Sequence, residues 1–114
     1  MAIIKSYTDL GQSKKLTDML PIESADHFHI IGHLHTDGPR YEVIRSKNEV
    51  SDHDRFWPCW SLAALLNVLP SATLDSSDDH YYRVHCMERY TEWYDNAVDA
   101  CYEMIVKLNE LKML

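Results

Sequence analysis

Residues 96–111 read NAVDACYEMIVKLNEL, and their pattern decides the expected architecture. Apolar side chains recur along it at the spacing of one helix face: Ala97, Cys101, Met104, Ile105, Leu108 and Leu111. Asn96 is a favourable N-cap residue, and Asp99 three positions later completes a start similar to a capping box. Lys107 and Lys112 lie near the end where the helix dipole favours positive charge. The stretch therefore predicts a helix over residues 96–111 with one buried face.

The residues before this helix have the alternation of half-buried strands. Over residues 81–87, two sets of side chains alternate, with Tyr82, Val84 and Cys86 on one side and Tyr81, Arg83 and His85 on the other. Residues 90–94 continue with strand-forming aromatic residues. We expect either one long bent strand or a hairpin here.

A second alternating stretch, DHFHIIGHLHTD, spans residues 26–37. In an extended strand, one side of this stretch carries Phe28, Ile30, Gly32 and Leu34. The other side carries His27, His29, Ile31, His33 and His35. Turn-forming residues at 37–39 precede another alternating run at 41–46, so the two runs are expected to pair as a hairpin. We interpret the histidine side as the solvent-exposed face of the strand.

The remaining segments complete an α+β pattern. Residues 9–20 predict a short helix with Thr8 or Asp9 as N-cap, ended by Pro21. Residues 60–69 predict a helix that is buried on most of its surface, and residues 47–55 and 71–79 predict polar loops. Three helices and three to four antiparallel strands make an α+β fold, with the second and third helices packed on one face of a single small sheet.

Length and charge limit the functional classes. With 114 residues and 46% hydrophobic residues, the chain is expected to form a single domain over residues 1–114. Eighteen acidic against eleven basic side chains leave a net charge of −7, which disfavours direct binding to nucleic acid. No run approaches the roughly 18 apolar residues of a membrane span, and the N-terminus does not have a signal peptide pattern. We expect a cytoplasmic protein without a membrane segment.

Four short motifs occur in order along the chain: Gln12-Ser13-Lys14-Lys15-Leu16, Ser24-Ala25-Asp26, Pro58-Cys59-Trp60-Ser61-Leu62-Ala63-Ala64-Leu65-Leu66 and Val98-Asp99-Ala100-Cys101. Through them the chain resembles a family of small proteins of gut bacteria and their phages or mobile elements. The family has no assigned activity, so the resemblance carries over no catalytic or binding residue. The histidine-rich strand is not part of the family pattern.

The histidines nevertheless suggest a metal-site hypothesis. Side chains two apart on a strand share a face, so the pairs His27 with His29 and His33 with His35 can each offer two imidazoles to one zinc ion. Asp37, His53 or a second subunit would complete such a site. The competing interpretation, which we favour, is a solvated strand face without a cofactor.

A thiol is the second chemical hypothesis. Cys59 precedes the helix expected from residue 60, where the helix dipole would favour its thiolate. Against this, Cys59 lies in an apolar run, and the odd number and wide spacing of Cys59, Cys86 and Cys101 favour three reduced, buried thiols. We assign no catalytic residue.

Aromatic residues are numerous between positions 81 and 94. Tyr and Trp are the residue types that anchor protein interfaces, so we take four of them as interface candidates: Tyr81, Tyr82, Trp93 and Tyr94. The leading hypothesis is a non-enzymatic module that binds a protein partner or a second copy of itself as a homodimer. An aromatic-rich core with scattered exposed tyrosines is the structural alternative. The functional alternative is a small metal-dependent or thiol enzyme that uses the histidine strand or Cys59.

Overall fold

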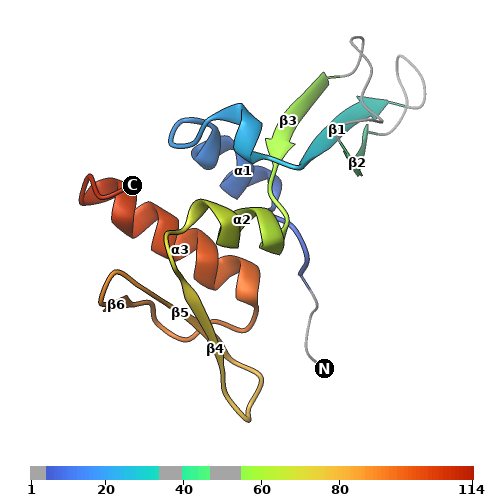
Figure 1. The fold of residues 1–114 in the computed structure, drawn as a ribbon. Coiled ribbons are helices and arrows are strands. Elements are labelled where there is room, and N and C mark those ends of the chain that lie inside the picture. The colour runs from blue at the N-terminus through green and yellow to red at the C-terminus, as the bar shows by residue number, and fades with distance from the viewer. Residues whose placement is uncertain (1–4, 34–39, 47–54) are drawn as a thin grey trace. The chain divides into compact units, whose positions relative to one another are not determined.

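The computed structural model describes residues 5–33, 40–46 and 55–114 (Figure 1). Within these ranges the chain forms three α-helices, one short 3₁₀ helix and two antiparallel sheets of three strands each, which confirms the α+β class. The strands thus divide between two sheets, where we expected one. The chain separates into two compact units, residues 9–60 and residues 1–8 with 61–114, and we describe each by itself. The single domain stays a prediction.

The unit of residues 9–60 begins with helix α1 (Leu10–Thr17). Asp9 is the N-cap, and the cap is a reciprocal capping box: Gln12 N donates to Asp9 Oδ1 at 2.8 Å, and Asp9 N donates to Gln12 Oε1 at 3.1 Å. The expected N-cap is confirmed, while the helix ends three residues earlier than predicted. The 3₁₀ helix η1 (Ile22–Ser24) follows Pro21.

The sheet of this unit has the order β2-β1-β3, with β1 (His27–His33) between β2 (Arg40–Ser46) and β3 (Arg55–Cys59). The predicted hairpin of the first two strands is confirmed, with His27 opposite Ser46. We did not predict β3, which begins at the last residue of the loop expected over residues 47–55 and ends just before the helix expected from residue 60; residues 47–54 lie outside the described residues. Since β3 lies at the edge of its sheet, it tolerates a proline that a central strand would exclude.

The core of this unit lies around β1, α1 and the end of β3. Its buried apolar residues are Leu16, Leu20, Ala25, Phe28, Ile30, Cys59 and Trp60. The rings of Phe28 and Phe56 meet edge to face with their centres 4.7 Å apart. The buried Trp60 indole donates from Nε1 to Ser24 Oγ at 2.9 Å, so its polar atom is satisfied inside the core.

The second unit contains α2 (Leu62–Val68), β4 (Thr73–Ser76), β5 (Tyr82–Cys86), β6 (Arg89–Tyr90) and α3 (Ala97–Glu110). Ser61 caps α2, because its Oγ accepts a hydrogen bond from Ala64 N at 3.2 Å. Within α2 only Leu65 is fully buried, so the expectation that this helix is buried on most of its surface is wrong. The buried Trp60 and Leu69 flank the helix instead of belonging to it.

Strand β4 forms where the sequence predicted a polar loop, and that prediction is wrong. Its partner explains the difference: Leu74 lies opposite Val84 and Asp75 opposite Arg83, so pairing with β5 determines the conformation of a locally polar segment. The sheet order is β4-β5-β6.

Helix α3 matches its predicted bounds within one residue, and it packs against β5 and α2 (Figure 1). Its buried residues are Val98, Ala100, Cys101, Met104, Ile105, Val106 and Leu108. Leu111, which we expected on the buried face, follows the helix and is 45% exposed. Among the described residues, no helix is long and apolar enough to cross a membrane.

The segment after β5 turns back as a hairpin, the second of the two arrangements that we predicted. Cys86 lies opposite Arg89, so Met87 and Glu88 form a two-residue turn. Both have positive φ values, 53° and 64°, as a type I′ turn requires. This turn returns the chain along β5 and leads it to residues 91–94.

Candidate functional site

The histidine strand is less exposed than we predicted. His29, on the side expected to face solvent, is buried with 6% of its surface exposed, and His27 is half-buried with Nδ1 3.1 Å from Asp26 Oδ1. The expectation of a solvent-exposed face is therefore wrong for His29, which lies between cross-strand partners on both sides, Ile44 of β2 and Trp57 of β3.

The proposed zinc ligands are only partly described. His33 belongs to β1 without a described side chain, and His35, Asp37 and His53 lie outside the described residues. No group of three or more His, Cys, Asp or Glu side chains in the described part of the chain is placed to hold a metal ion. The zinc hypothesis thus has no structural support from His27 and His29.

The cysteine hypothesis depended on a helix that begins elsewhere. Cys59 belongs to β3 and is fully buried, whereas α2 begins at Leu62. The premise that the dipole of that helix activates Cys59 is therefore wrong. Cys86 and Cys101 are also buried. Burial raises the pKa of Cys86 and raises the pKa of Cys101 to about 12. Buried thiols with raised pKa values are poor nucleophiles at neutral pH.

The candidate site is instead on the sheet of β4, β5 and β6. One face of this sheet carries a group that we name the aromatic face: Tyr81, Arg83, His85, Tyr90 and Trp93. The opposite side of β5 buries Val84 and Cys86. The strand alternation of residues 81–87 is thus confirmed, and it separates a core side from an accessible side.

The accessible side chains form a continuous stack. The His85 and Tyr90 rings are stacked with centres 4.3 Å apart and planes 12° apart. The Arg83 guanidinium carbon lies 4.4 Å from the centre of the Tyr90 ring and 4.7 Å from that of Trp93. Arg83 is in turn held by Asp75, whose Oδ2 accepts from Arg83 Nε at 3.2 Å. One cation therefore joins two exposed aromatic rings by cation–π contacts.

A β-bulge places Trp93 on this face. His85 lies opposite Tyr90, while Tyr82 and Tyr94 exchange two backbone hydrogen bonds of 2.7 Å. Between these pairs, two residues, 92 and 93, face the single Arg83, and this extra residue reverses the alternation. Without the bulge, residue 92 would be opposite Arg83, so the local backbone decides which side chain the face presents.

The four interface candidates consequently divide between two sides of the sheet. Tyr81 and Trp93 are exposed, at 47% and 44% of their surface. Tyr82 and Tyr94 are half-buried. Sequence reasoning did not select Tyr90, which is 50% exposed, or Arg83, although the alternation of residues 81–87 already placed Arg83 with Tyr81.

A cleft of about 440 Å³ adjoins the aromatic face. Four residues line it: the exposed aromatic residues Tyr81 and Trp93, together with Ser77 and Asp79. The turn between β4 and β5 positions Ser77 and Tyr81 beside the cleft, because Ser77 N donates to Tyr81 O at 2.9 Å and Tyr81 N donates to Ser77 Oγ at 3.1 Å. The cleft thus combines aromatic surface with a negative charge.

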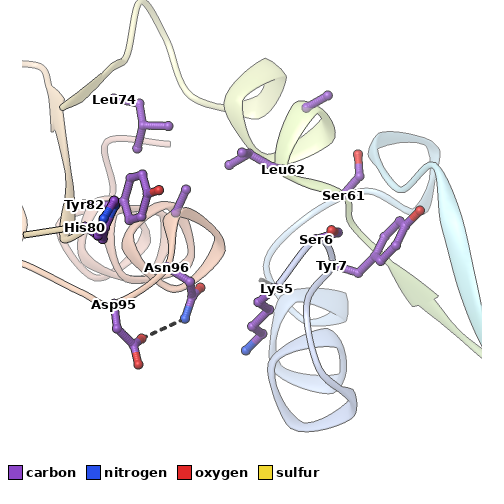
Figure 2. Close-up of a pocket in the computed structure, with 12 residues that line it drawn as sticks. Lys5, Ser6, Tyr7, Ser61, Leu62, Leu74, His80, Tyr82, Asp95 and Asn96 are labelled. Atoms are coloured by element: carbon purple, nitrogen blue, oxygen red, sulfur yellow. Dashed lines mark hydrogen bonds between the residues drawn. The ribbon is translucent and has the colours of Figure 1, made fainter. Parts of the chain in front are cut away.

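A larger cavity of about 460 Å³ lies in the same unit (Figure 2). Leu74, Tyr82 and Asn96 lie on one side of it, and Lys5 and Ser61 on the other. Three of its polar side chains support the fold: Lys5 Nζ donates to Asp99 Oδ1 at 2.8 Å, Asn96 Nδ2 donates to Asp95 Oδ1 at 3.0 Å, and Ser61 caps α2. The cavity has the volume of a small-molecule site, but these groups are engaged within the protein.

Comparison with models of known protein families, with curated proteins and with solved structures finds no match to this chain.

Proposed function

We propose that this protein is a non-enzymatic interaction module that binds a protein partner through the aromatic face. The observation that carries the proposal is the stack of His85, Tyr90, Arg83 and Trp93, in which exposed rings are held in place by a paired cation. Rings that are already ordered lose little conformational entropy when a partner covers them.

The residue types also support a binding role. Tyr, Trp and Arg are enriched among the residues that dominate binding energy at protein interfaces. Here all three types occur on one accessible sheet face, and Tyr81, Tyr90 and Trp93 each leave more than two fifths of their surface exposed. An enzyme would require convergent reactive groups, whereas the described thiols are buried and the stacked groups are paired with one another.

The resemblance to small proteins of phages and mobile elements gives the module its expected context, an accessory protein in the cytoplasm. The acidic net charge of −7 favours a protein partner over nucleic acid. The partner in this proposal is another protein or a second copy of the chain.

A random peptide library displayed on phage tests the proposal. We expect the wild-type protein to enrich peptides that share a consensus sequence. Trp93→Ala and Tyr90→Ala should each bind the consensus peptide at least tenfold more weakly, a difference of about 1.4 kcal/mol. Leu111→Ala, another exposed apolar residue, is the matched control and should bind normally.

Self-association of the chain is tested separately, by sedimentation equilibrium across a hundredfold dilution. A homodimer through the aromatic face dissociates more readily in Trp93→Ala than in Leu111→Ala. The proposal is contradicted when no peptide binding depends on the aromatic face and the mass stays that of a monomer at every concentration.

A further inference from the structure

The cleft beside the aromatic face has the components of a cation-binding pocket. Two aromatic residues, Tyr81 and Trp93, line it together with the acidic residue Asp79 and with Ser77. Aromatic rings and a carboxylate both attract a positive side chain, whereas a neutral side chain gains only the apolar contact.

The protein already shows this recognition within its own chain. The Arg83 guanidinium lies 4.7 Å from the centre of the Trp93 ring. Its charge is offset by Asp75, whose Oδ2 lies 3.2 Å from Arg83 Nε. The Trp93 ring is thus held in place by one cation and still leaves 44% of its surface exposed.

The charge of the surroundings selects the same class of ligand. The unit of residues 1–8 and 61–114 carries nine acidic side chains and five basic ones. Three of the acidic residues, Asp78, Glu92 and Asp95, are close in sequence to the residues of the cleft. This excess attracts cationic segments and repels phosphate or carboxylate ligands.

We infer that the cleft of Ser77, Asp79, Tyr81 and Trp93 binds a basic side chain, arginine or lysine, of the protein partner. The inference rests on the proposed function, since it names the chemistry of the partner that meets the aromatic face. The basic side chain lies against the Tyr81 and Trp93 rings, and its charge is paired with Asp79.

Titration of the isotope-labelled full-length protein tests the cleft directly. The probes are N-acetyl-arginine methylamide and its neutral isostere N-acetyl-citrulline methylamide, followed at the Trp93 indole N–H by NMR. We expect a saturable shift with the arginine probe and at least about fivefold weaker binding of the citrulline probe. Raising the salt concentration should weaken binding of the arginine probe alone.

Two variants test whether Asp79 supplies the negative charge that the arginine probe binds. Asp79→Asn should weaken binding of the arginine probe about fivefold and leave that of citrulline unchanged, while Glu110→Gln changes the net charge equally and should leave both unchanged. The spectrum of Asp79→Asn reports whether the variant is folded. Equal binding of the two probes, no saturable shift, or an Asp79→Asn variant that binds like wild type would overturn the inference.

The peptide library separates this inference from the proposed function. Enriched peptides that depend on Trp93 and contain arginine or lysine support both. Enriched peptides that depend on Trp93 but lack basic residues support the interaction module and overturn the inference that the cleft binds a basic side chain.

Discussion

The Arg83 guanidinium lies above the Trp93 ring, 4.7 Å from its centre, while Asp75 Oδ2 accepts a hydrogen bond from Arg83 Nε. We expect Arg83→Gln to leave the fold intact but to release the Trp93 ring, because an exposed cation–π contact contributes only about 0.5–1 kcal/mol. The Trp93 indole should become more accessible to solvent in NMR relaxation-agent measurements. Lys112→Gln removes a remote positive charge, and a similar change in that control would contradict the prediction.

The cap of α3 is expected to stabilise the unit measurably. Asn96 Oδ1 accepts a hydrogen bond from Asp99 N at 2.8 Å, so Asn96→Ala leaves a helix donor without its partner. The free energy of unfolding should fall by about 1 kcal/mol in urea titrations. Asn96→Ser should keep most of this stability, because serine retains a capping oxygen and adds no carboxylate beside Asp95 and Asp99. Asn67→Ala, on the exposed side of α2, is the control. Equal losses in both asparagine-to-alanine variants would show that the cap itself contributes little.

The ion pair of Lys5 and Asp99 joins the N-terminal segment to the first turn of α3. Its atoms are 2.8 Å apart, and the two side chains are 22% and 28% exposed. Because solvent still screens the pair, we expect a coupling energy of about 1 kcal/mol in a double-mutant cycle of Lys5→Met and Asp99→Asn. Additive single effects would mean that the pair contributes nothing to stability.

A change of sequence in the β5–β6 turn is expected to increase the stability of the protein. Met87 and Glu88 both adopt left-handed backbone, which is costly for residues with a Cβ atom. Asn-Gly is the favoured sequence for this turn, so Met87→Asn combined with Glu88→Gly should raise the free energy of unfolding by about 1 kcal/mol. Met87 is 43% exposed, so little apolar contact is lost. A lower unfolding midpoint in the double variant would contradict the prediction.

Alkaline pH is expected to destabilise the protein through Cys101. Burial raises the pKa of Cys101 from 9.0 to about 12 in the folded protein, so the unfolded chain loses this proton first. The stability that depends on the protonated thiol is complete below pH 9 and is lost as the pH rises through 9 to 12, by up to about 4 kcal/mol. In urea titrations between pH 8 and 11, Cys101→Ala should be less stable at pH 8 but lose less with rising pH. Equal slopes for variant and wild type would refute this assignment.

Local pattern was sufficient where one element determines its own conformation. The caps at Asp9 and Asn96 were predictable because the capping oxygen lies in the residue beside its own helix. The alternation of residues 81–87 was predictable because a strand with one buried side requires it. The residues of the first hairpin, β1 with β2, were predictable for the same reason.

Other features depended on partners far away in the sequence. Residues 73–76 are polar apart from Leu74 and form a strand through pairing with β5. Pro58 is acceptable in β3 because that strand is at an edge of its sheet. His29 is buried and has cross-strand neighbours on both sides, Ile44 and Trp57, an arrangement that alternation alone does not give.

The sequence by itself therefore determined the α+β class, the bounds of α3 and the two sides of β5. The tertiary structure decided which aromatic side chains are accessible together. The bulge at residues 92–93 reverses the alternation, so Trp93 joins Arg83 and Tyr90 on one face while Tyr94 is on the other. Sequence spacing could not show this, because the bulge is set by the pairing of residues 91–94 with β5, and one extra residue in a strand exchanges its two faces.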